Sequence, residues 1–156
     1  MSDKDLIIDT NLLLLLVIGA VENGRHIRNS SRLNQFNEDD YQTVIKVMSE
    51  YKKVCITPYI ATEVSNLIDL NGHAYVLAME IARELFKLFE TLETNIEADC
   101  TPAHFLQYGI TDSSLISLVT DYTVLTNDNR LLAPLYDACP ENVLPYAVIK
   151  AIRSKR

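Results

Sequence analysis

Four carboxylates in this chain stand where an apolar run gives way to a turn or where a helix is expected to open. They are Asp9, Glu63, Asp112 and Asp128. A carboxylate that follows a buried strand cannot stay charged and unpaired, because its desolvation costs several kcal/mol or forces it to take up a proton. If the strands run parallel, their carboxyl ends meet along one edge of the sheet, where ligands bind in open α/β sheets. Four converged negative charges call for divalent cations.

The chemistry available to such a cluster is metal-assisted. Mg²⁺ and Mn²⁺ are hard cations that prefer oxygen ligands and keep several waters. A water bound to such an ion becomes a usable nucleophile, and two ions about 4 Å apart stabilise both the attacking and the leaving oxygen of an in-line displacement. No histidine is then required. His26, His73 and His104 lack the i, i+4 pairing of a helical metal site, and we interpret them as ordinary core or surface residues.

The size and composition of the chain predict one globular domain over residues 1–156. Of these residues, 48% are hydrophobic, enough for one sizeable core. The longest apolar run, residues 12–18, is well short of the roughly 20 residues that span a bilayer. The sequence also lacks the basic segment and cleavage pattern of a signal peptide, so we expect a cytoplasmic protein without a membrane partner. The cysteines, Cys55, Cys100 and Cys139, support neither a disulfide framework nor a zinc knuckle.

The net charge of −7 argues at first against a nucleic-acid partner, since phosphate binding normally leaves a basic footprint. Removing the four candidate ligands from the 21 acidic residues leaves 17 against 14 Lys and Arg, a residual of −3. Two divalent ions would cancel the four removed charges. A metal-loaded form is therefore only mildly acidic, which disfavours non-specific wrapping of duplexes but allows a local contact with one short strand.

Apolar patterns predict that strands and helices alternate along the chain. Strands are predicted at residues 6–8, 54–56 and 122–125, with a weaker one at 96–100. Helices are predicted from residue 12, from 40 to 51, from 57 to 70, from 73 to 94, from 111 and from about 130. Residues 142–149 fit either a fifth strand or a last helix. The alternation indicates a parallel sheet covered on both faces.

Two segments are candidates for contacts beyond the core. Residues 22–40 are polar and are predicted to form a long loop, and loops of this length are usually functional or disordered. The helix at 73–94 has a wide apolar face, which fits packing on the sheet and also fits a homodimer partner.

The four acids occur in an ordered set of motifs. An apolar strand leads into Asp9-Thr10-Asn11, Glu63 lies on a helix, Gly109-Ile110-Thr111-Asp112 opens another helix, and a strand leads into Thr126-Asn127-Asp128. This ordered set resembles the PIN domain family of nucleases over nearly the whole chain. The resemblance implies a three-layer αβα sandwich with a central, mostly parallel sheet of four to five strands, and metal-dependent cleavage of single-stranded or structured RNA.

The resemblance also implies a role for each residue of the set. Asp9 would be the central ligand of a Mg²⁺ or Mn²⁺ ion, Glu63 and Asp112 would complete the first metal site, and Asp128 would help to hold a second ion or its waters. Hydrogen bonds around them would come from Asn11 and Thr126. The candidate phosphate contacts are Arg130, Arg25, Arg28 and Arg32.

Some of these positions also have a structural interpretation. Asp112, in a first helical turn, complements the helix dipole, and Asp128 is suited to cap a short helix. Ile116, four residues after Asp112, stands where some relatives offer a further acid.

The leading functional hypothesis is a metal-dependent endoribonuclease that acts as the toxin of a toxin-antitoxin pair, with an antitoxin protein as partner. The alternative is a catalytically silent PIN-like domain that binds RNA or a protein, and the presence of all four acids counts against it. A haloacid dehalogenase-like phosphatase would need a second aspartate where this chain has Asn11. A receiver-type signalling domain would need a paired acid and a late lysine, and it fits poorly.

Overall fold

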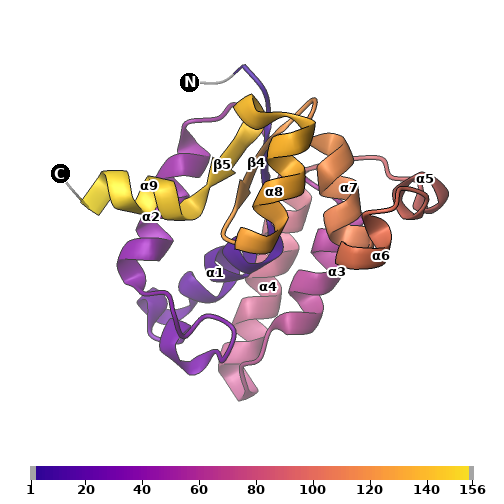
Figure 1. Cartoon of the computed structure of the whole chain (residues 1–156). Helices are drawn as coiled ribbons and strands as arrows, with labels where there is room; N and C mark the ends of the chain where they lie inside the picture. The colour runs from indigo at the N-terminus through magenta and orange to yellow at the C-terminus, as the bar shows by residue number, and fades with distance from the viewer. Residues whose placement is uncertain (1–2, 155–156) are drawn as a thin grey trace.

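Five short strands form one sheet in residues 3–154, the part of the chain that the computed structural model describes (Figure 1). They are β1 (Leu6–Ile8), β2 (Val54–Ile56), β3 (Glu90–Thr91), β4 (Thr123–Thr126) and β5 (Val143–Pro145). Their order is β3-β2-β1-β4-β5, and every neighbouring pair is parallel. All five carboxyl ends therefore lie along one edge, as the alternation of strands and helices predicts.

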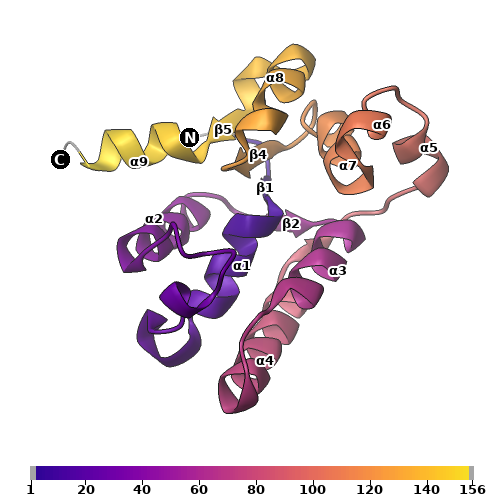
Figure 2. The ribbon, with the colours of Figure 1, turned by 60° about the horizontal axis from the view of Figure 1, so that its bottom comes forward.

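Helices cover both faces of this sheet. Within the described residues they are α1 (Thr10–Gly19), α2 (Glu38–Ser49), α3 (Pro58–Leu67), α4 (Gly72–Leu88), α5 (Ile96–Cys100), α6 (Phe105–Tyr108), α7 (Ile110–Leu118), α8 (Asn129–Ala138) and α9 (Tyr146–Ser154). Figure 2 shows α1 to α4 on one side of the strands and α7 and α8 on the other. The architecture is a three-layer αβα sandwich, which confirms the predicted fold class.

Helix α1 is apolar on all sides and forms the centre of the core. Every residue from 12 to 18 is at most 2% exposed, and the helix packs against α2, α3 and α4. A helix that is hydrophobic all round must be enclosed by other elements. Because α1 begins at Thr10, directly after β1, this burial also fixes the position of its N-cap, Asp9. No helix within residues 3–154 has both the length and the apolar character needed to cross a bilayer.

The segment at residues 22–40 contains no strand, and its α-helix begins only at Glu38, so the predicted polar loop covers residues 22–37. Its first half contains two 3-10 turns, Val21–Gly24 and Ile27–Asn29. Helix α2 begins at Glu38, because Asn37 caps it by accepting a hydrogen bond from a backbone N–H of the first turn at 3.0 Å. The predicted boundary at residue 40 is therefore too late.

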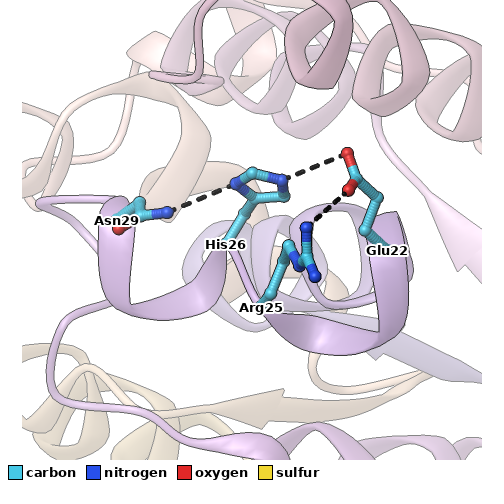
Figure 3. Close-up of polar contacts among 4 residues, drawn as sticks. All are labelled: Glu22, Arg25, His26 and Asn29. Carbon is cyan, nitrogen blue, oxygen red and sulfur yellow. Dashed lines mark hydrogen bonds and ion pairs between the residues drawn. The ribbon is translucent and has the colours of Figure 1, made fainter.

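Side-chain contacts hold the first half of this segment together (Figure 3). The Glu22 carboxylate accepts a hydrogen bond from the Arg25 guanidinium at 3.1 Å and lies 3.4 Å from His26 Nε2. Asn29 Nδ2 lies 3.3 Å from the other ring nitrogen of His26. The side chain of Leu33, further along the segment, is fully buried. These contacts bind the segment to the domain, although it lacks the apolar periodicity by which helices are recognised in a sequence.

The structure differs from the prediction at two neighbouring elements, strand β3 and helix α5. Residues 96–100 form helix α5, because Asn95 caps them by accepting a hydrogen bond from the Ala98 N–H at 2.9 Å. The helix predicted at 73–94 ends at Leu88, and its last residues instead supply the extended β3. A two-residue strand is too short to show an alternating pattern, which is why the sequence does not reveal it.

The two alternatives for residues 142–149 both occur in succession. β5 ends at Pro145, and α9 begins at Tyr146. The proline ends the strand because it has no N–H to donate to a further strand partner.

A buried carboxylate joins α2 to the C-terminal helix α9. Asp40 is 2% exposed and accepts hydrogen bonds from the Tyr146 hydroxyl at 2.6 Å and from the Asn37 N–H at 3.0 Å. The Lys150 ammonium lies 3.2 Å from the same carboxylate. Burial and the neighbouring Asp40 charge raise the pKa of Tyr146, so its hydroxyl keeps its proton and remains a donor. These contacts hold α9 against the domain.

We expect Tyr146→Phe to lower the free energy of unfolding by about 1–3 kcal/mol, because it removes one donor from a buried charge. Urea denaturation of the two proteins measures the difference. Tyr136→Phe is the matched control, since Tyr136 is 41% exposed and its hydroxyl loss should leave the stability unchanged. Equal stability of Tyr146→Phe and the unaltered protein would show that this hydrogen bond does not hold α9 in place.

Candidate functional site

The carboxyl ends of β1 and β4 lie side by side at the centre of the sheet. Ile8 at the end of β1 pairs with Leu125 of β4, and the Asp9 N–H donates to the Leu125 carbonyl at 2.9 Å. The strand order reverses between these two strands, because β2 and β3 lie beyond β1 while β5 lies beyond β4. In open α/β sheets this switch point opens a crevice in which ligands bind. Asp9 and Asp128 follow the two strands that form it.

Asp9 is buried at this point and carries two hydrogen bonds. It is 6% exposed, its Oδ1 accepts from the Thr10 N–H at 2.7 Å, and its Oδ2 accepts from the Thr126 hydroxyl at 2.6 Å. Burial raises the pKa of Asp9, the two hydrogen bonds oppose this rise, and the charges of Asp128 and Glu63 add to it. The net pKa is raised, so the folded protein does not fully stabilise the charge of Asp9.

Thr126 links Asp9 to Asp128. Its hydroxyl donates a hydrogen bond to Asp9 and accepts one from the Asp128 N–H at 3.0 Å. Asp128 in turn caps α8, with its Oδ1 accepting from the Arg130 N–H at 3.0 Å. The structural interpretation of Asp128 as a cap is therefore correct, and the same residue is close enough to Asp9 to raise its pKa. Thr126 therefore contacts Asp9 directly, as its predicted supporting role requires.

Glu63 and Asp112 come from the helices α3 and α7. The Thr111 hydroxyl donates a hydrogen bond to the Glu63 carboxylate, which joins the two helices. Asp112, the next residue, lies in the first turn of α7. The helix predicted from residue 111 begins at Ile110 with Gly109 as its N-cap, so the hydroxyl of Thr111 is available to Glu63.

The four carboxylates repel one another across this site. The pKa of Asp112 rises to about 7, first because the group is partly buried and then because of the charges of Asp9, Asp128 and Glu63, while Arg130 lowers it. Three helix N-termini, those of α1, α7 and α8, also face these acids and supply partial positive charge. The pKa values of Asp9 and Asp112 stay raised in spite of this, so the site lacks positive charge.

The donors at this site fit a hard divalent cation. Each of the four acids offers carboxylate oxygens, the ligand type that Mg²⁺ and Mn²⁺ prefer, and a cation would relieve their repulsion. Next to Asp128, the side-chain oxygen of Asn127 is buried and has no hydrogen-bond partner among the described residues. A buried oxygen without a donor is a further atom that a cation or its waters would satisfy. Sequence reasoning missed Asn127, because an asparagine after a strand is an ordinary turn residue.

One group of three side chains in the described residues brings its ligand atoms within 4.8 Å of one another, and it lies elsewhere. It consists of Asp5, Cys55 and Glu90, near the amino ends of the strands. Burial and the two acids raise the pKa of the Cys55 thiol to about 11, so the thiol stays protonated, and it donates to Glu90 at 3.7 Å. Lys53 lies 3.8 Å from Glu90. Glu90 in this group thus has a thiol donor and a Lys nearby, whereas the four candidate acids are spaced more widely than this group is.

The arginines and Asn11 are placed differently from one another. Asn11 accepts a hydrogen bond from Arg32 at 3.5 Å, which places Arg32 at the first turn of α1. Arg25 is paired with Glu22 instead, and Arg28 is exposed on a 3-10 turn. Of the predicted phosphate contacts, Arg130 acts on one of the acids, Asp112, and Arg32 contacts the predicted supporting residue Asn11.

Comparison of the sequence with models of known protein families finds no match, and comparison with curated proteins finds none either.

We expect the metal-free protein to lose stability as the pH rises from about 4 to about 8. The pKa of Asp112 is about 7 in the folded state, above the ordinary value of 3.8. Between these two values the folded state binds more protons than the unfolded state, so the free energy of unfolding falls with rising pH. Urea denaturation in the presence of a chelator, at several pH values, measures this trend.

Asp112→Asn should remove most of that loss. At pH about 8 it should raise the free energy of unfolding of the metal-free protein by about 1 kcal/mol, a value that allows for solvent screening of a half-exposed group. At pH about 4 the two proteins should be equally stable, because Asp112 is then protonated. Asp137→Asn, an exposed position on α8, is the control and should have no effect. A pH-independent effect of Asp112→Asn would contradict the repulsion argument.

Proposed function

We propose that this chain is a divalent-metal-dependent endoribonuclease that hydrolyses RNA phosphodiester bonds. The observation that supports it best is the electrostatic coupling of four acids from remote parts of the sequence at the switch point of a parallel sheet. The charges of Asp9, Asp128 and Glu63 all raise the pKa of Asp112. If these acids were only N-caps, they would not need to lie near one another, since a single carboxylate is enough to cap each helix N-terminus.

In the proposed mechanism the acids hold the cation and the threonines orient the acids. Asp9, Glu63 and Asp112 would bind the first Mg²⁺ or Mn²⁺ ion, and Asp128 would hold a second ion or its waters. When bound, the cation supplies positive charge that activates water for attack and stabilises the negative charge that develops on the phosphoryl group. Thr126 and Thr111 donate hydrogen bonds to Asp9 and Glu63, and these contacts hold the two carboxylates in place.

The choice of RNA follows from the resemblance of the ordered acids to the PIN domain nucleases, to which we propose this chain belongs. The positions of Arg32 and Arg130 support a phosphate-containing substrate. Arg32 contacts Asn11 at the start of α1, and the charge of Arg130 acts on Asp112. Positive side chains at the rim of an acidic site can contact the substrate backbone while the cations occupy its centre.

We also propose that the nuclease is the toxin of a toxin-antitoxin pair. The support is the resemblance to the PIN domain family, whose compact members often have this role. Growth arrest on expression in bacterial cells, relieved by a small protein encoded next to this gene, would support this role. Growth without arrest, despite RNA cleavage by the purified protein, would refute the toxin role and leave the nuclease proposal standing. Homodimerisation through α4 stays a prediction.

We expect Asp9→Asn or Asp112→Asn to reduce RNA cleavage by at least about 1000-fold, because each removes a ligand from a centre that supplies several kcal/mol of transition-state stabilisation. Chelation should reduce cleavage by the unaltered protein to a similar extent, and added Mg²⁺ or Mn²⁺ should restore it. Gel analysis of a labelled RNA measures both effects. Asp137→Asn is the control and should cleave normally. Full activity in both ligand variants would refute the site.

Metal binding separates the nuclease from the silent alternative. Calorimetric titration with Mn²⁺ should show binding at millimolar concentration or tighter, weakening as the pH falls below about 7, because the carboxylates must be deprotonated to bind. Asp112→Asn should weaken it further, and Asp137→Asn should not. RNA binding without metal binding or cleavage would identify the silent domain.

A further inference from the structure

A cation–π contact joins two helices beside the carboxylate cluster. The guanidinium carbon of Arg130, at the start of α8, lies 5.4 Å from the centre of the Tyr108 ring at the end of α6. Tyr108 is half-buried, whereas Arg130 is exposed. The ring is therefore the fixed partner of the pair, and the guanidinium is the part that a ligand can reach.

Both residues of this pair are tied to the candidate ligands through the backbone. The Arg130 N–H donates to Asp128, so the start of α8 is held at the site. Tyr108 precedes Gly109, whose φ of +85° suits a glycine and turns the chain into α7, where Asp112 lies in the first turn. The charge of Arg130 reaches Asp112 and lowers its pKa. The guanidinium thus lies at the rim of the cluster.

A guanidinium that stacks on a ring keeps its donors free. The cation–π contact uses the flat face of the group, while its N–H donors point outward along its edge. Two of these donors can bind two oxygens of one phosphate in parallel. Without the ring, the long side chain would sample many rotamers and lose conformational entropy on binding, which weakens the contact.

We infer that Tyr108 is a positioning residue for RNA binding: its ring holds the Arg130 guanidinium at the rim of the carboxylate cluster, where the guanidinium binds a phosphate of single-stranded RNA. The inference rests on the proposed function and adds a defined backbone contact to it. No sequence motif marks this pair, because the two residues lie on different helices and meet only in the fold.

The test measures the binding affinity for a fluorescently labelled single-stranded RNA over a range of salt concentrations. All variants carry Asp9→Asn so that the RNA is not cleaved, and the protein with Asp9→Asn alone is the parent. Arg130→Gln should reduce the slope of log affinity against log salt by about 0.7, the value for one phosphate contact of a single strand. Tyr108→Leu should reduce the slope towards the same value and weaken binding about fivefold, as expected for the loss of a contact of cation–π strength. Tyr108→Phe keeps the ring and should behave like the parent.

Arg153→Gln is the charge-matched control. Arg153 lies on α9, which Figure 2 shows on the opposite side of the molecule from α6, so its loss should leave the slope unchanged. Because the ring of Tyr108 also packs against the core, Phe would satisfy a purely structural role as well. The readout that such a role would not move is the salt slope, since partial unfolding lowers the bound fraction without removing one phosphate contact.

Several outcomes would overturn the inference. Equal slopes for Tyr108→Leu and Tyr108→Phe would do so even if the unaltered protein cleaves RNA. A salt slope in Arg130→Gln equal to that of the parent would also overturn the inference, whether or not Tyr108→Leu folds. Arg130 is exposed, so its substitution leaves the core intact. Absence of RNA binding by the parent would overturn this inference, whereas the proposed function is decided separately by cleavage with the unaltered protein. The expected slopes without any cleavage by the unaltered protein would support the contact and refute hydrolysis alone.

Discussion

Asp9 is buried where β1 ends and α1 begins, and its charge has too few positive partners there. The donors that it has are the backbone N–H of Thr10 and the hydroxyl of Thr126, and its pKa is still raised by burial and by the neighbouring acids. A second carboxylate, Asp112, shares this shortage of positive charge and reaches a pKa of about 7. In the metal-free folded state these buried charges therefore lower the free energy of unfolding, and a divalent cation would remove that loss. The rest of the domain must compensate for it.

The apolar core that compensates for this loss of stability is built around α1. Seven successive apolar residues, 12–18, are enclosed by three other helices, so the start of α1 cannot move without disturbing the centre of the domain. The contrast with the group formed by Asp5, Cys55 and Glu90 is informative. There the thiol stays protonated and donates to Glu90, and Lys53 lies 3.8 Å from the same carboxylate. Glu90 therefore has a donor and a cation beside it, whereas Asp9 has donors but no ion-pair partner among the described residues.

At the candidate site, capping and the proposed ligand roles fall on the same residues. Asp128 is an N-cap and Asp112 lies in a first helical turn, as their structural interpretations from sequence predict, and Asp9 is an N-cap that the sequence did not indicate. A carboxylate oxygen has two lone pairs, and a cap uses only one of them. Helix starts also bring partial positive charge to the acids. These facts explain why a metal site can be assembled from residues that each look like an ordinary cap.

The sequence by itself determined the buried strands, the apolar helix α1 and the position of each acid relative to its own element, because these depend on neighbours a few residues away. It did not determine β3 or α5, where a two-residue strand and a cap at Asn95 leave no periodic signal. Only the tertiary structure decided the strand order, the Thr111 contact with Glu63 and the stacking of Arg130 on Tyr108. Those contacts join residues far apart in the chain, and their energies depend on burial and distance, which a linear pattern does not contain.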